Sequence, residues 1–227
     1  PIKTHQMFDK LKTVIKRNTQ IKRFIMWSIS PTNNPRPRLW VKWFINPFVH
    51  KKGKGAIIRR RKSRIDVFPW NQFSIGNNTI IEDFTTINNG AGNIIIGNNA
   101  RVGIGSVIIG PVYLGNKVGL GQHVFISGFN HGYEDGERDS NEQALVKKEV
   151  IIDDESHIGA NSVIVAGVHI GKRCQIGAGS VVTKNIPDYS VAVGNPAKII
   201  KRYNFQNKTW ERTQELVPLV NNNSNHI

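Results

Sequence analysis

Histidines are the side chains of this 227-residue chain whose ordinary pKa best suits acid–base chemistry near neutral pH. It contains seven histidines and a single cysteine, Cys174, and no serine or cysteine stands in a nucleophile motif. An imidazole can accept a proton near neutral pH, so the histidines are the residues to place first. His131 opens a polar, acid-rich segment of the sequence, whereas His123, His157 and His169 lie within a regular repeat.

That repeat has a period of six residues and fills residues 75–193. Its fifteen units each open on an aliphatic residue, and most carry a small or β-branched residue at the fifth position. A period of six fits neither an amphipathic helix nor an alternating strand, and it is typical of a β-solenoid in which each unit is a short strand plus a corner. Stacked coils would then bury a continuous aliphatic ladder. The opening residues are Ile75, Ile81, Ile87, Ile96, Val102, Ile108, Leu114, Leu120, Ile126, Ile152, Ile158, Ile164, Ile170, Ile176 and Val182.

Two insertions interrupt the repeat. The first adds three residues between Ile87 and Ile96, and the second runs from about His131 to Val150. If three units make one turn, equivalent positions lie 18 residues apart, and stepping back 36 residues from His131 reaches Ile95. Both insertions should therefore project from the same corner, two turns apart. Insertions in repeat proteins commonly gather on the binding face.

Composition limits the classes of protein to consider. Hydrophobic residues make up 39% of the chain, and no stretch approaches the roughly 18 to 20 apolar residues of a membrane span. No signal-peptide pattern opens the sequence, so we expect no secretion. One cysteine excludes a disulfide framework, and Cys174 falls on a fifth position of the repeat, where we expect a buried core residue. These features predict a cytoplasmic protein, with peripheral contact to the inner membrane as a further expectation.

Positive charge is concentrated ahead of the repeat. The net charge is +15, and residues 1–64 hold 18 of the 31 Lys and Arg residues against one acid, Asp9. We consider three roles for this region: an in-plane anchor on an anionic membrane surface, a grip on the diphosphate of a lipid-linked glycan, or a helical cap on the solenoid or its neighbours. Nucleic-acid binding is not expected, because no readout motif accompanies the charge.

The predicted organisation has three parts. A basic, partly helical extension covers residues 1–55, with a helix expected over residues 3–27. The solenoid covers residues 56–200, with a protruding loop over residues 131–150. A C-terminal helix and polar tail cover residues 201–227, the helix being expected over residues 203–217.

Three segments carry a resemblance to a known family. They are residues 127–132 (SGFNHG), 158–163 (IGANSV) and 176–199 (IGAGSVVTKNIPDYSVAVGNPAKI). Over about residues 56–203 the sequence resembles the left-handed β-helix, hexapeptide-repeat acyltransferases, and within them the branch of galactoside and maltose acetyltransferases and polysaccharide O-acetyltransferases. The resemblance implies an all-β solenoid, a left-handed parallel β-helix, that assembles as a homotrimer and uses acetyl-CoA.

The same resemblance implies the site residues. A histidine on the protruding loop acts as general base, and His131 is the matching residue; its imidazole would take the proton from an attacking sugar hydroxyl. The implied reaction is direct O-acetylation of a carbohydrate or lipid-linked glycan in surface polysaccharide biosynthesis. The matching donor positions are Ala160 and Ala178 along the pantetheine arm, Thr183 and Lys184 near the adenosine and 3′-phosphate end, and Lys198 and Lys201 facing the CoA phosphates.

Further contacts are less sharply indicated. Asn88, Asn89, Tyr113 and His123 are candidate substrate contacts. His157 stands where the family often has a tryptophan. An aromatic contact with the cofactor arm would then have to come from another residue, and Tyr113 and Phe129 are the candidates. An acid that orients His131 is expected, and the sequence does not choose among the six in or beside the loop: Glu134, Asp135, Glu137, Asp139, Glu142 and Glu149.

We expect no metal. The zinc-dependent carbonic anhydrases among related solenoids bring three histidines together with a five-residue step between two of them, whereas His123 and His131 are eight residues apart.

Three other functions stay open. An N-acetyltransferase on a nucleotide-linked amino sugar would use the same coil, although such enzymes usually carry a nucleotide-binding domain ahead of it, and the basic segment shows no strand–glycine–helix pattern. An antibiotic acetyltransferase is also open, because loops encode the acceptor. A non-catalytic solenoid that binds a polyanion or a membrane would have no reason to keep His131 on a loop or Lys184 after residues 180–183.

Overall fold

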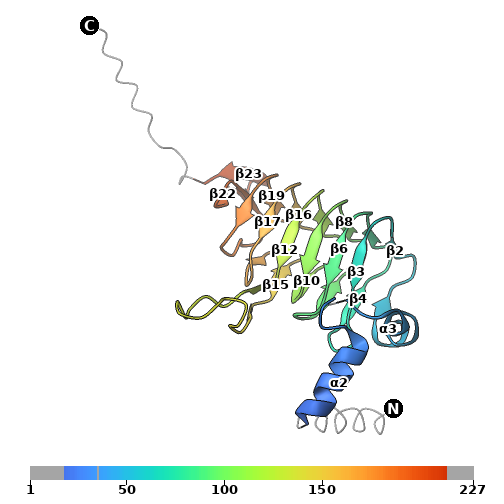
Figure 1. The fold of residues 1–227 in the computed structure, drawn as a ribbon. Coiled ribbons are helices and arrows are strands. Elements are labelled where there is room, and N and C mark those ends of the chain that lie inside the picture. Colours follow the sequence, from blue (N-terminus) through green and yellow to red (C-terminus); the bar gives the residue numbers. More distant parts are fainter. Residues whose placement is uncertain (1–17, 35, 214–227) are drawn as a thin grey trace.

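The computed structural model describes residues 18–34 and 36–213, and most of these residues wind into a parallel β-solenoid (Figure 1). Three sheets, here named A, B and C, run along its three sides. From β1 to β20, apart from the separate pair β13 and β14, successive strands enter sheets A, B and C in turn, so that each coil is a triangle stacked on the one before. This architecture confirms the predicted β-helix.

The strands that define each side are short, mostly two or three residues. Sheet A contains β1 (Lys51–Lys52), β4 (Phe73–Ile75), β7 (Ile94–Ile96), β10 (Val112–Leu114), β15 (Val150–Ile152) and β18 (His169–Ile170). Sheet B contains β2 (Ile57–Ile58), β5 (Ile80–Ile81), β8 (Arg101–Val102), β11 (Gly119–Leu120), β16 (His157–Ile158), β19 (Gln175–Ile176), β21 (Ser190–Val193), β22 (Lys198–Asn204) and β23 (Thr209–Arg212). Sheet C contains β3 (Arg64–Asp66), β6 (Thr86–Asn88), β9 (Val107–Ile109), β12 (Phe125–Ser127), β17 (Val163–Ile164) and β20 (Val181–Val182).

The core is the ladder that the repeat predicts. All fifteen opening residues are at most 4% exposed, and the fifth-position residues are buried beside them, except Ala91 and Asn130 at the two insertions. Asn78 and Asn99 take positive φ values of 54° and 55° at equivalent corners, a conformation that asparagine tolerates better than most residues. Cys174 is buried as expected, and that burial raises the pKa of its thiol, as befits a structural residue.

The C-terminal end differs from the prediction. No helix forms over the described part of residues 203–217; β22 instead pairs antiparallel with β21, and β23 pairs with β22. The last coil leaves an open strand edge, and pairing along that edge satisfies the backbone of residues 198–204. Asn204 begins the turn by accepting a hydrogen bond from the backbone N–H of Gln206 at 2.9 Å. Residues 214–227, including the end of the predicted helix and the tail, lie outside the described residues.

Helices cover the other end of the solenoid. Of the helix expected over residues 3–27, residues 3–17 lie outside the described residues, and the remainder is α2 (Thr19–Ile29), which is N-capped by Asn18. Next come α3 (Leu39–Phe44) and α4 (Asn46–Val49), which lie against the first coil. The amide of Asn46 donates to the carbonyl of Val67 at 2.8 Å. None of the helices in the described part is long and apolar enough to cross a membrane.

His50 ends this helical cap. Its Nδ1 accepts a hydrogen bond from the backbone N–H of Phe73 at 3.3 Å, and the two rings meet edge to face. Burial lowers the pKa of the imidazole, because a charged ring would lose hydration there.

Candidate functional site

Both insertions leave the solenoid at one edge, where strands of sheet C run into strands of sheet A; we call it the C–A edge. The first follows β6 and the second follows β12, and only β9 lies between these strands in sheet C. The expected shared corner, two turns apart, is therefore confirmed. At Gly128, where the long insertion begins, an added Cβ would lie 2.1 Å from the carbonyl oxygen of Pro111, so the coils stack this closely only with glycine there.

The long insertion projects from a small ribbon. Strands β13 (Phe129–Asn130) and β14 (Val146–Lys147) pair antiparallel at its base, so that Phe129 lies opposite Lys147. Beyond the ribbon, the Gln143 side chain closes the loop. Its Nε2 donates to the carbonyls of Asp135 and Arg138, both at 2.9 Å, and its Oε1 accepts from the Asp135 N–H at 3.1 Å.

His131 lies at the root of this loop, directly after β13. Its imidazole is exposed and faces the ring of Phe129 edge-on, with 5.6 Å between the ring centroids. None of the six candidate acids makes a hydrogen bond to it among the described contacts. Asp135 and Asp139 instead accept from the backbone N–H groups of Glu137 and Asn141, so these carboxylates stabilise turns. The orienting carboxylate expected from the sequence is thus absent from the described contacts of this single chain.

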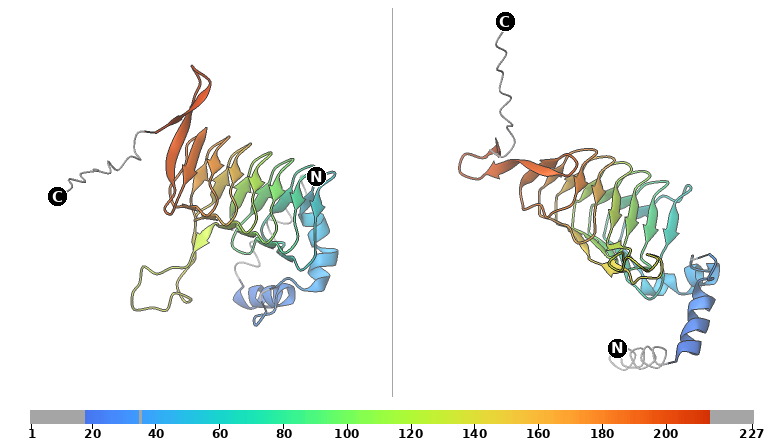
Figure 2. Two further views of the ribbon diagram at one scale, coloured as in Figure 1. Left: turned by 90° about the horizontal axis from the view of Figure 1, so that it is seen from above. Right: turned by 60° about the vertical axis from the view of Figure 1, so that its left-hand side comes forward.

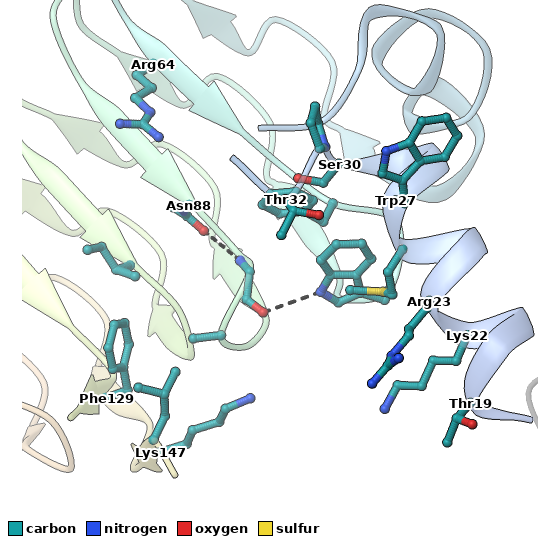
Figure 3. A pocket seen from close by; sticks show the side chains of 18 residues that line it. Thr19, Lys22, Arg23, Trp27, Ser30, Thr32, Arg64, Asn88, Phe129 and Lys147 are labelled. Atoms are coloured by element: carbon teal, nitrogen blue, oxygen red, sulfur yellow. Dashed lines mark hydrogen bonds between the residues drawn. The ribbon is translucent and has the colours of Figure 1, made fainter. Parts of the chain in front are cut away.

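A groove of about 980 Å³ lies between α2 and the C–A edge, and we call it the α2 groove. Figure 2 shows α2 and the long loop on the same side of the solenoid, and Figure 3 shows the side chains that line the groove between them. Sequence reasoning missed this feature. The lining residues are Thr19, Lys22, Arg23, Met26, Trp27, Ser30, Pro31, Thr32, Arg64, Phe68, Trp70, Asn88, Gly90, Ala91, Ile109, Phe129, Leu145 and Lys147.

The two asparagines of the first insertion have different positions. Asn88 lines the α2 groove, where its Oδ1 accepts from the Gly90 N–H at 2.7 Å. Asn89 is 0% exposed. Its Oδ1 accepts from the N–H of Phe68 at 2.6 Å, and its Nδ2 donates to the carbonyls of Phe68 at 3.1 Å and Asn71 at 2.9 Å. The expectation that Asn89 contacts an acceptor is therefore wrong, because its amide is buried and committed to the neighbouring corner.

The predicted donor residues divide between two edges. Ala160 and Ala178 stack at the B–C edge, where sheet B runs into sheet C; the Ala160 carbonyl accepts from the N–H of Gly179 at 2.8 Å. Lys198 approaches this edge, since the N–H of Ala197 donates to the Val181 carbonyl at 2.8 Å.

The remaining donor positions lie elsewhere. Thr183 and Lys184 follow β20 and lie exposed at the C–A edge, two strands of sheet C beyond the one that precedes the loop of His131. Lys201 pairs with Val191 within sheet B. One chain therefore does not bring the six residues together, because a full side of the solenoid separates the two edges.

Two further candidates lie apart from His131. Tyr113 points outward from the middle of β10, between Ile95 and Ile151 of the adjoining strands, on the outer face of sheet A. His123 occupies the B–C edge with a φ of 56°, on the same edge as Ala160 and not beside His131. No group of three or more His, Cys, Asp or Glu side chains that could hold a metal occurs among residues 18–34 and 36–213.

Known proteins share this repeat and fold. Residues 149–184 match the family model described as the hexapeptide repeat of succinyl-transferase. Among curated relatives, the protein named as acetyltransferase Rv3034c of Mycobacterium tuberculosis is 32% identical over 142 residues, which is 62% of this chain and 46% of that protein. The galactoside O-acetyltransferase of Lactococcus lactis is 31% identical over 145 residues, 63% of this chain and 69% of the relative.

A third relative comes from Escherichia coli. The protein named as lipopolysaccharide biosynthesis O-acetyl transferase WbbJ is 33% identical over 132 residues, 54% of this chain and 67% of the relative. Among solved structures, a mutant of AntD, an N-acyltransferase from Bacillus cereus in complex with dTDP and coenzyme A, superimposes with a TM-score of 0.60 at 22% identity, over 73% of this chain and 88% of that one.

The solved structure supports the fold alone, whereas two of the relatives match across at least two thirds of their own lengths. The chain spans less than half of the mycobacterial relative. Together with the buried hexapeptide ladder, these matches show that the chain belongs to the left-handed β-helix, hexapeptide-repeat family of acetyltransferases.

Proposed function

We propose that this protein transfers an acetyl group from acetyl-CoA to a hydroxyl of a carbohydrate, in the biosynthesis of a bacterial surface polysaccharide. The observation that carries the proposal is the exposed imidazole of His131 at the root of the only long insertion in residues 75–193, beside the α2 groove. Two relatives in the same family are named as O-acetyltransferases, one for galactosides and one for lipopolysaccharide biosynthesis.

His131 acts as general base in the proposed reaction. The imidazole removes the proton from the acceptor hydroxyl as its oxygen attacks the thioester carbonyl, which makes the oxygen a competent nucleophile. The tetrahedral intermediate then expels the CoA thiolate, and the imidazolium returns the proton to that sulfur. No acyl-enzyme forms, consistent with the burial of Cys174. Because His131 is exposed in one chain, it needs further groups around it to exclude water and to fix its tautomer.

We propose that those groups come from a second copy of the chain. The donor positions lie on two edges, with His131 at one edge and Ala160 and Ala178 at the other. In a homotrimer with parallel axes, the B–C edge of one subunit would face the C–A edge of the next. Acetyl-CoA would then lie between subunits, with its pantetheine arm along the small side chains of Ala160 and Ala178 and its phosphates toward lysines.

Replacing His131 tests the chemistry. His131→Ala should lower kcat by about 10² to 10⁴-fold while leaving acetyl-CoA affinity within about twofold, because the imidazole acts on the acceptor proton. The assay follows CoA release with carbohydrate acceptors and, in parallel, with amino-sugar acceptors, so that N-acetylation is detected if it occurs. Unchanged turnover in His131→Ala would remove this mechanism.

Mixing two inactive variants tests the shared site. Ala178→Trp should block the donor arm, and His131→Ala should remove the base, so neither variant alone transfers acetyl. Trimers reassembled from both variants contain interfaces with an intact His131 from one chain and an intact Ala178 from another. Activity should therefore return on mixing. If mixed trimers form but stay inactive, both residues serve the site of a single chain and the intersubunit arrangement is wrong.

We further propose that the helical end contacts an anionic membrane surface. Large apolar side chains project from α2, α3 and α4 without cover in this chain, Phe48 being 86% exposed and Trp43 67% exposed. Residues 36–64, which include α3 and α4, are rich in lysine and arginine. Aromatic rings suit the headgroup layer, and each nearby cation adds about 1 kcal/mol of attraction to anionic lipid.

A further inference from the structure

The α2 groove combines an apolar floor with cations on two sides. Phe68 and Trp70 stack with ring centroids 4.5 Å apart and planes at 19°, and Trp70 Nε1 donates to the Gly90 carbonyl at 3.4 Å. Trp27 and Phe129 extend this apolar surface on the helix side and on the loop side. An apolar floor of this size favours a ligand with a flat ring or a hydrocarbon portion.

The charge in the groove has one sign. Lys22, Arg23, Arg64 and Lys147 line it, and none of the described lining residues is acidic. Arg64 already pairs with the buried Asp66, a carboxylate that also faces Arg36 at 3.8 Å.

The other three cations are Lys22, Arg23 and Lys147. No carboxylate among the described residues lies within 4.0 Å of the side-chain nitrogens of Lys22, Arg23 or Lys147. Figure 3 shows Lys22 and Arg23 extending into the groove from α2 while Lys147 approaches from the loop. Three cations that converge from two sides are suited to a group that carries more than one negative charge. Each cation attracts each negative charge of the ligand and can donate charge-assisted hydrogen bonds to its oxygens.

We propose that the α2 groove is the acceptor site, and that it binds a sugar joined through a phosphate or diphosphate to an apolar or aromatic group. Lys22, Arg23 and Lys147 would hold the phosphate, and the aromatic floor would hold the group attached to it. The proposal rests on the proposed acetyl transfer. The sugar would then extend toward His131, because Phe129 is both a wall of the groove and the ring against which His131 lies.

Two sources of this chemistry are distinguishable: a nucleotide-linked sugar, whose base would stack on the aromatic floor, and a lipid-linked sugar, whose hydrocarbon chain would cover it. The probes are UDP-glucose and geranyl-diphosphate-linked glucose, each titrated calorimetrically into the full chain, with free glucose as a third ligand. We expect one of the two phosphate-bearing probes to bind and free glucose not to bind.

The decisive variant is Lys22→Gln with Arg23→Gln, which removes two exposed charges from α2, a helix that has no buried residue in this chain. The matched control is Arg60→Gln with Arg61→Gln, which removes two exposed charges from the same basic region outside the groove. The first pair should raise the Kd of the probe about tenfold or more, because the loss of even one hydrogen bond to a charged group is enough to change Kd about tenfold. The control pair should change it less than twofold.

Two results would overturn the site: neither phosphate-bearing probe binds, or the control pair weakens binding as much as the groove pair. Circular dichroism establishes that each variant is folded. Acetyl-CoA is titrated into the same samples and should bind all of them equally. Failure of the unmodified chain to bind acetyl-CoA would refute the proposed function, whatever the groove binds.

Discussion

Asn89 ties two neighbouring corners of the C–A edge together, and its replacement gives a sharp test of the structure. Asn89→Ala removes three hydrogen bonds, to the N–H and carbonyl of Phe68 and to the carbonyl of Asn71. All three partners are backbone groups of the preceding corner, and Phe68 is itself only 4% exposed. The variant therefore leaves the buried N–H and carbonyl of Phe68 and the half-buried carbonyl of Asn71 without these partners, and water has little access to the Phe68 groups to replace them.

The expected cost follows from those three contacts. Each lost bond to a buried backbone group costs about 1 to 2 kcal/mol, so the sum is about 4 kcal/mol. For a chain of this size, such a loss lowers Tm by about 10 °C. Asn88→Ala is the matched control at the adjacent residue. It removes only the contact with the Gly90 N–H, which is half-buried, and should cost about 1 kcal/mol or less.

Urea unfolding followed by far-UV circular dichroism measures both variants. Protein concentration must be held constant, because association of subunits would add to the apparent stability. A free energy of unfolding for Asn89→Ala that lies within 1 kcal/mol of Asn88→Ala would refute the burial and the hydrogen-bond assignment of Asn89. It would also reopen the acceptor role that the sequence suggested for this residue.

Two further predictions concern the helical end. Burial lowers the pKa of His50 in the folded protein, so the unfolded chain binds the proton more readily. The contribution of His50 to the free energy of unfolding should therefore be fully present above pH 6.5 and should be lost as the pH falls below it. His50→Gln should flatten this pH dependence, measured by urea unfolding between pH 7.5 and 5.5. Phe44→Ser with Phe48→Ser should reduce sedimentation with anionic liposomes at physiological salt, relative to an exposed control such as Phe205→Ser at the opposite end of the solenoid. A variant that sediments like the unchanged protein would show that these aromatic rings do not contact the membrane.

The sequence was most informative where one spacing recurred. Fifteen aliphatic openers at a period of six could be assigned to the core because every coil must bury the same position, and each of them is buried. The first coil does not follow this pattern, so the repeat did not predict it. Lys52 occupies the position that Ile75 fills in the next coil. A coil at the end of the stack has a neighbour on one side only, so that position need not be apolar.

The C-terminal hairpin and the α2 groove could not be predicted for another reason. Residues 198–204 become a strand because the last coil offers an edge to pair with, which is a property of the stack and not of that segment. The groove depends on how α2 lies against the C–A edge. Trp27 and Lys147 are 120 residues apart in the chain, and no local pattern indicates that they share a wall.

The counting that placed both insertions at one edge also constrains the donor site. In a coil of 18 residues, a separation of about six residues is one full side of the triangle. Ala178 precedes Lys184 by six residues, so one chain must hold them at different edges, as the structure does. If the residues that the resemblance assigns to one donor site do hold one ligand, we expect a second chain to bring them together, because the repeat separates them by a full side. The division of the donor residues is thus a consequence of the hexapeptide period itself, and it makes subunit association a condition for the proposed catalysis.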